Sequence, residues 1–169
     1  MKRMIGNGLL TFVIMQAIIT VLQFLLGPIS ILISFITSSG KIYNTALCVI
    51  AFLLKFAGVF VFLRIKNRDN RNITLKFFIA TLSIAVMIQF IVALIFGFSP
   101  FIVGEEILTI AMKWSHADVF SDVPTYIFLA LYPVNVLCIF GAGISAFFLA
   151  KRKQKKEREE LIGKTGEND

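Results

Sequence analysis

Long apolar runs separated by short polar segments dominate the chain. Four of these runs, over residues 8–26, 43–63, 75–96 and 126–149, are long enough to cross a bilayer. A helix of about 20 apolar residues spans the roughly 30 Å of hydrocarbon. The pattern therefore predicts an all-α polytopic membrane protein, with a bundle of four transmembrane helices forming one domain over residues 1–150.

A shorter segment between the third and fourth runs has an amphipathic pattern. Within residues 104–114, the apolar residues Ile107, Ile110 and Trp114 recur at helical spacing. The polar residues Glu105, Glu106, Thr109 and Lys113 fall on the opposite side. This pattern predicts a short helix lying in the outer interface parallel to the membrane, anchored by Trp114, with Glu105 and Thr109 facing water.

Proline and asparagine suggest where two of the helices end or begin. Pro28 interrupts the apolar stretch that follows the first run, which predicts a kink there and a separate short helix over Ser30–Ile36. Asn72 ends the short polar link between the second and third runs, and we expect it to cap the third helix.

Composition and charge agree with this class and give it an orientation. Apolar residues make up 57% of the 169 residues, and mean hydropathy is +0.85. Of the 17 Lys and Arg residues, all except Lys41, Lys55 and Lys113 fall at the N-terminus, in the link over residues 64–76 or in the tail over residues 151–169. The positive-inside rule therefore predicts that both termini are cytoplasmic, in the plasma membrane. In the tail, the basic residues expected to contact anionic lipid are Lys151, Arg152, Lys153, Lys155 and Lys156.

Lys55 lies in the middle of the second run, and no run contains an acidic residue. A central lysine costs about 2.5–3.5 kcal/mol on insertion scales. Four readings remain open: the side chain extends to the headgroups, it is neutral, it pairs with a carboxylate of another protein, or it serves a transported anion or other ligand.

Helix rise places a long polar side chain from each run in roughly the same layer of the membrane. Lys55 would thus meet amide groups from the other three helices, whose carbonyl oxygens are expected to accept its hydrogen bonds. This predicted partner or ligand site within the membrane consists of Gln16, Lys55, Gln89 and Asn135.

The fourth run also contains small residues at spacings that allow close helix packing. Packing inside the bundle is favoured over a dimer face as their role. The residues concerned are Gly141, Ala142, Ser145 and Ala146.

No pattern in the chain indicates catalysis, a cofactor or a metal ion. The two cysteines, Cys48 and Cys138, both lie in apolar runs and are expected to act as small packing residues. His116 stands alone in a loop, and its spacing from acidic residues matches no ligand motif. The basic segments lack any base-reading module, so nucleic acid is not expected as a partner.

These observations predict a non-enzymatic accessory, regulatory or immunity-type protein that acts by binding another integral membrane protein or a copy of itself. The alternative is a small oligomeric transporter, lipid-linked flippase or channel subunit that uses the polar layer around Lys55. In both cases the lipid bilayer is the surrounding partner.

The predicted orientation can be tested by labelling a single cysteine at position 118. In a Cys48→Ala/Cys138→Ala background, Asp118→Cys is expected to react with a membrane-impermeant maleimide on intact cells, because residues 97–125 are predicted to be outside. Labelling only after lysis would reverse the orientation.

Overall fold

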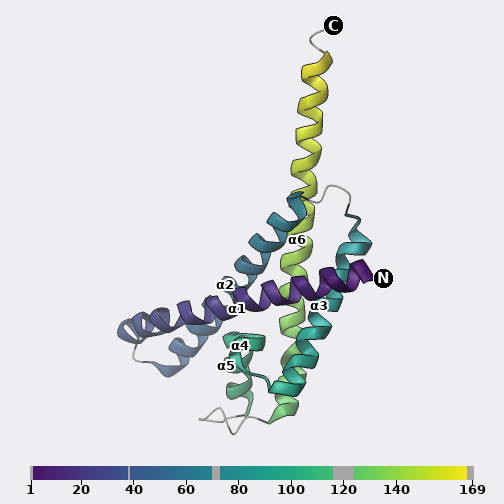
Figure 1. Ribbon diagram of the computed structural model, residues 1–169. Helices are drawn as coiled ribbons and strands as arrows, with labels where there is room; N and C mark the ends of the chain where they lie inside the picture. Colours follow the sequence, from purple (N-terminus) through teal and green to yellow (C-terminus); the bar gives the residue numbers. More distant parts are fainter. Residues whose placement is uncertain (1, 38, 70–72, 116–123, 167–169) are drawn as a thin grey trace.

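The computed structural model describes residues 2–37, 39–69, 73–115 and 124–166, and these residues are helical apart from short connections. Figure 1 shows the arrangement of the helices, numbered along the chain. They are α1 (Lys2–Ile36), α2 (Gly40–Asp69), α3 (Leu75–Phe96), α4 (Pro100–Val103), α5 (Glu105–Ser115) and α6 (Thr125–Gly166).

Four of these helices are long and apolar enough to cross a membrane. The qualifying stretches, within the described residues, are Met4–Ile36, Ile42–Asn67, Leu75–Phe96 and Thr125–Glu159. The predicted all-α fold with four membrane-compatible helices is therefore confirmed. The chain is a multi-pass membrane protein by this measure.

Two predicted details of the helix ends are wrong. Pro28 lies inside a continuous α1, so Ser30–Ile36 is not a separate helix. Helix α3 is capped by Thr74, whose side-chain oxygen accepts a hydrogen bond of 3.3 Å from the backbone amide of Phe77. Position 72, the expected cap, lies outside the described residues. The threonine hydroxyl satisfies an amide group of the first turn that would otherwise lack a partner within the helix.

The helices are arranged as a splayed bundle (Figure 1). Helix α1 packs against α2 and α3, and α2 packs against α6. The α1–α2 hairpin extends away from α3 and α6, and the two short helices α4 and α5 lie in the angle between the two pairs. Helix α5 contacts both α2 and α6, so it fills the space that the divergence of the long helices leaves.

Small residues on α6 allow the long helices to approach one another. Ala142 and Ala146 are fully buried in the core, whereas Ser145 is exposed and Gly141 is half-buried. On α6 the tightest approach is at Gly143, where an added Cβ would lie 2.8 Å from a methyl carbon of Leu82 on α3. Only part of the predicted small-residue set therefore packs inside this bundle.

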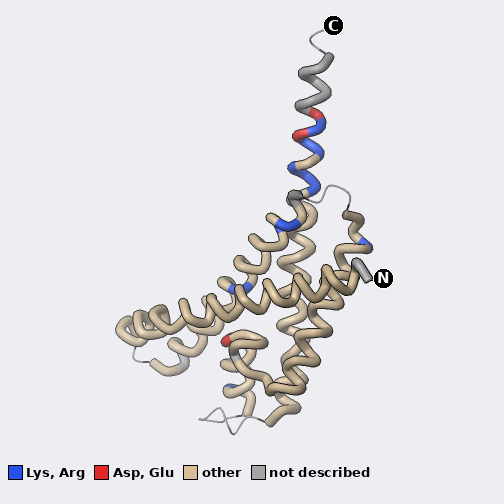
Figure 2. The backbone as a smooth tube through the Cα atoms, viewed as in Figure 1, with Lys and Arg blue, Asp and Glu red and all other residues tan. Residues whose placement is uncertain are grey.

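Charge is separated along the molecule (Figure 2). Lys and Arg gather on α2, on the start of α3 and on α6 beyond the apolar core, all towards the same end of the molecule. The acidic residues of α5 lie on the opposite side of α1 from this basic end.

Candidate functional site

A sharp change of direction after α3 returns the chain into the bundle. Gly97 ends α3 with a φ of 85°, a backbone conformation that favours glycine. Pro100 then begins α4, at the helix position where its missing amide hydrogen costs nothing. The residues between them therefore specify a turn followed immediately by a new, very short helix.

Gly104 separates α4 from α5 with a φ of 106°. This break leaves the last carbonyl groups of α4 without the amide donors that a continuous helix would supply. Inside a membrane protein these carbonyl groups cannot be left unpaired, because each would cost several kcal/mol in a medium without water. Donors must therefore come from neighbouring helices.

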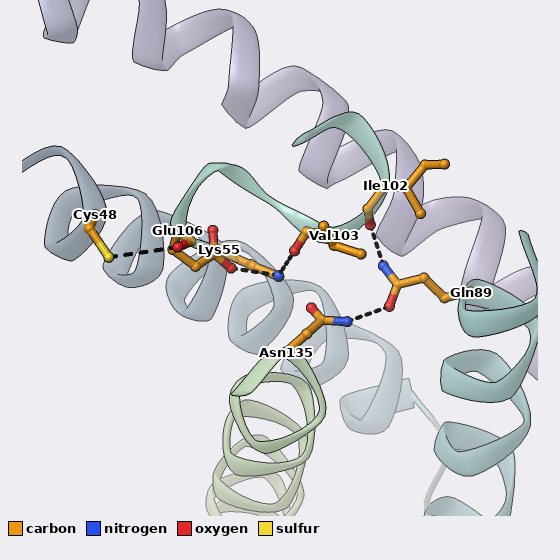
Figure 3. Close-up of polar contacts among 7 residues, drawn as sticks. All are labelled: Cys48, Lys55, Gln89, Ile102, Val103, Glu106 and Asn135. Carbon is orange, nitrogen blue, oxygen red and sulfur yellow. Dashed lines mark hydrogen bonds and ion pairs between the residues drawn. The ribbon is translucent and has the colours of Figure 1, made fainter. Parts of the chain in front are cut away.

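Three of the long helices supply these donors, one carbonyl group each, and Figure 3 shows the contacts made by α2 and α3. Gln89 on α3 donates a hydrogen bond of 2.6 Å to the Ile102 carbonyl oxygen. Lys55 on α2 donates to the Val103 carbonyl oxygen, and Gln16 on α1 donates to that of Phe101. Consecutive carbonyl groups at the end of α4 are thus held by three different spans.

The fourth long helix completes the layer through an amide–amide contact. Asn135 on α6 is fully buried, and its Nδ2 donates to Gln89 Oε1 at 2.8 Å (Figure 3). Gln89 is therefore oriented by α6 while it holds α4. One turn away, the Tyr132 hydroxyl donates at 2.9 Å to the Val86 carbonyl oxygen, a second polar link between α6 and α3.

A buried ion pair lies at the start of α5. The Lys55 Nζ is 2.6 Å from Glu106 Oε1, and the two side chains are 3% and 1% exposed. Lys55 thus bridges the end of α4, through the Val103 carbonyl oxygen, and the first turn of α5. A carboxylate at this position also suits the N-terminal end of the α5 dipole.

The structure therefore brings together all four predicted polar residues, but with partners other than those expected. The amide oxygens of Gln16, Gln89 and Asn135 do not accept the hydrogen bonds of Lys55; Glu106 and a backbone carbonyl oxygen do. The acidic partner was missed because it lies outside the four apolar runs. The sequence did contain a signal for this pair. One span holds a lysine without a counter-charge, and a partly apolar segment elsewhere in the chain holds two adjacent glutamates.

The helix predicted over residues 104–114 is present as α5, but it does not lie across the outer ends of the spans. Gln89 lies seven residues before the end of α3, and Asn135 lies ten residues after the start of α6, so the tip of α4 is about 10–15 Å inside the bundle. The 11 residues of α5 cover about 16 Å, which returns the chain to the end where α6 begins. Segments Pro100–Val103 and Glu105–Ser115 thus form a re-entrant hairpin.

The faces of α5 also differ from the prediction. Glu106, expected on the polar side of the helix, is buried together with Ile107. Glu105 is half-buried. Its pKa is raised, mainly by desolvation and to a smaller extent by the neighbouring Glu106 carboxylate. Helical periodicity separates apolar from polar residues, but it does not tell whether a polar face meets water or a buried cation.

Three buried oxygen atoms around the re-entrant hairpin have no hydrogen-bond partner among the described residues. They are Gln16 Oε1, Glu106 Oε2 and Asn135 Oδ1. Buried polar atoms are normally satisfied, so this layer retains acceptor capacity for a donor from outside the chain. Water or a protonated ligand group would fit that capacity.

One of the two cysteines also contacts this site. The two cysteines are free thiols, and the Cys48 sulfur contacts the Glu106 carbonyl oxygen at 3.8 Å. Across the described ranges no group of His, Cys, Asp and Glu could hold a metal ion, and His116 lies outside them. The basic residues of the tail are mostly exposed, and two of them, Lys153 and Lys155, lie 3.9 and 3.7 Å from glutamates one turn further along.

Comparison of the chain with protein-family models, curated proteins and solved structures finds no match. The site must therefore be interpreted from its own geometry.

The buried ion pair predicts strong coupling between two substitutions. Lys55→Leu and Glu106→Leu are each expected to lower the free energy of unfolding by about 3–5 kcal/mol, because each leaves an uncompensated buried charge. The double variant removes both charges and leaves only the Val103 carbonyl group without its donor, at about 1–3 kcal/mol. Unfolding in mixed detergent, followed by circular dichroism, measures these values. Glu105→Leu is the matched control and should change stability little; additive effects of the two single substitutions would contradict the pairing.

Gly104 and Gly97 allow backbone strain to be separated from a steric clash. Both residues have positive φ, but an added Cβ at Gly104 would lie 2.4 Å from a Glu106 carboxylate oxygen, whereas at Gly97 nothing lies within 4 Å. Gly97→Ala is expected to cost about 1–2 kcal/mol from φ alone. Gly104→Ala should cost clearly more, because it also displaces the carboxylate from Lys55. Equal losses in the same unfolding assay would show that Glu106 does not occupy this position.

Proposed function

We propose that this protein is a small membrane transport protein that moves an anionic solute or an anionic lipid headgroup, using the Lys55–Glu106 pair as its internal site. The observation that carries the proposal is the broken helix between α4 and α5, held inside the bundle by a buried ion pair. Non-helical backbone at membrane depth is tolerated where it is buried in protein or lines a cavity, and transporters use such breaks to bind substrates.

The same geometry suggests how an anion would be exchanged. Lys55 is the cation of the site, and an incoming anionic group would compete with Glu106 for it. Lys55 would then release Glu106, which lies on α5. Because Glu106 belongs to the re-entrant hairpin and Lys55 to a span, this exchange would couple substrate binding to movement of the hairpin.

The structure changes the relative support for the two functions expected from the sequence. The partner-binding hypothesis was motivated by a lysine without a counter-charge, and Glu106 now supplies that charge within the chain. One observation still favours an accessory role. The outer part of the α1–α2 hairpin has only a small core of Leu26, Leu47 and Ala51, and it leaves Phe35 and Ile36 more than 80% exposed. A second membrane protein could pack on this part of the hairpin.

In this proposal the protein lies in the plasma membrane with both termini cytoplasmic, so that the basic end of the bundle faces the anionic leaflet. The re-entrant hairpin then enters the bundle from the outer side, where α6 begins. Substrate would reach Lys55 from that side when the hairpin moves.

Reconstitution into phosphatidylcholine vesicles tests the transport function. Two probes are used: radiolabelled inorganic phosphate for uptake, and a fluorescent phosphatidylglycerol whose quenching by dithionite reports movement between leaflets. The wild-type protein is expected to exceed protein-free vesicles with at least one probe. The Lys55→Leu/Glu106→Leu variant should lose about tenfold or more of that rate, because the site's cation is gone.

Lys113→Gln provides the control, since Lys113 is exposed at the far end of α5 and should keep the wild-type rate. Two results would overturn the transport function: a wild-type rate equal to that of empty vesicles with both probes, or an unchanged rate in the folded double variant. Copurification of a stoichiometric second membrane protein would then favour the accessory role.

A further inference from the structure

A second polar site lies at the basic end of the bundle, on the far side of the core from the re-entrant hairpin. A pocket of about 380 Å³ opens between α1, α2 and α3, within the size range of small-molecule sites. It is lined by Asn7, Thr11, Leu63, Lys66, Asn67, Ile73, Thr74, Phe77, Phe78, Thr81 and Leu82. None of these lining residues is acidic.

Asn67 is the feature that points to a ligand. Its side chain lines the pocket, the residue is only 4% exposed, and both its amide nitrogen and its amide oxygen lack a hydrogen-bond partner among the described residues. A buried amide left unpaired at both atoms costs free energy unless a ligand or water completes it. The backbone at this position is fixed separately, because the Asn67 carbonyl oxygen accepts a hydrogen bond from Gln154 on α6.

Two further features make the pocket suitable for an anion. Lys66 brings its ammonium group to the pocket wall, where it donates a hydrogen bond to the hydroxyl of Thr11, itself 1% exposed. The N-terminal end of α3, a helix of 22 residues, reaches the pocket through Thr74 and Phe77. The dipole at such an end attracts negative charge, phosphate in particular.

The apolar half of the lining indicates what else the ligand carries. Phe77, Phe78 and Leu82 continue the pocket wall from the polar groups towards the apolar body of the bundle. The basic residues of α2, α3 and α6 gather at this same end (Figure 2). A ligand with a phosphate group and an adjoining apolar part matches both halves of the lining.

We propose that this pocket binds the phosphate group of a phosphate ester, held by Lys66, the Asn67 amide and the N-terminal end of α3. The apolar lining and the cationic Lys66 favour an anionic glycerophospholipid of the surrounding leaflet as the source, and a soluble anionic phosphate ester shares the same chemistry. This site is separate from Lys55 and Glu106, and binding at it does not depend on transport.

Lipid binding to the purified full chain tests the proposal. The protein is delipidated in mild detergent, and native mass spectrometry then measures binding of phosphatidylglycerol and, separately, of phosphatidylcholine. We expect at least one phosphatidylglycerol to bind with higher affinity than phosphatidylcholine. Lys66→Gln should weaken phosphatidylglycerol binding by about tenfold, the loss typical of a charge-assisted hydrogen bond. Asn67→Asp, which keeps the shape of the side chain but adds negative charge to the pocket, should weaken it at least as much.

Arg64→Gln is the matched control, because it removes the same charge from the same end of α2 at an exposed position outside the pocket. It should leave the affinity within about twofold of the wild-type value, as expected for a surface charge. Circular dichroism of each variant checks that the fold is retained.

A competition experiment distinguishes the two sources of phosphate. Displacement of bound phosphatidylglycerol by sn-glycerol 3-phosphate would identify a soluble phosphate ester as a ligand, whereas retention of the lipid identifies the lipid. The proposal is overturned if folded Lys66→Gln and Asn67→Asp bind phosphatidylglycerol as Arg64→Gln does. Equal binding of phosphatidylcholine and phosphatidylglycerol by the wild-type protein would also overturn it.

Discussion

The need to satisfy backbone carbonyl groups inside the bundle organises the polar interior of this protein. A helix broken at Gly104 leaves carbonyl oxygens without the donors of a continuous helix. Gln16, Lys55 and Gln89 each donate to one of them, and Asn135 orients Gln89. Polar residues that are costly in separate apolar helices become a matched set once the re-entrant hairpin lies between those helices.

The ion pair fixes the position of α5 more than it adds to the net stability of the protein. The cost of desolvating a lysine and a glutamate offsets much of their attraction. A buried ion pair therefore adds little stability compared with two apolar side chains of similar size. Its geometry nevertheless fixes α5 relative to α2, because Lys55 contacts both the last residue of α4 and the first turn of α5. A pair of apolar side chains makes no directional contact and would fix the position of α5 along α2 less specifically.

The sequence predicted the parts of the structure that repeat along the chain, and missed those that depend on contacts between distant segments. Runs of about 20 apolar residues specify membrane-spanning helices by length alone, and helix rise placed Gln16, Lys55, Gln89 and Asn135 in one layer. The depth of α5 depends instead on the pairing of Glu106 with a residue 51 positions away. Local amphipathicity carries no information about that partner, so α5 was expected at the surface. Asn67 was likewise missed, because its unpaired amide is evident only once α1, α2 and α3 enclose it.

The contribution of one donor by each long helix has a consequence for how the protein is made. Ribosomal synthesis delivers α1, α2 and α3 first, then the re-entrant hairpin, and α6 last. Until α6 arrives, Gln89 lacks the amide that orients it, and α5 lacks one of the two long helices it packs against. Spans can enter the bilayer independently, but this hairpin is stable at depth only in contact with its neighbours. Docking of the hairpin is therefore a late step of biogenesis, after the whole membrane domain has left the ribosome.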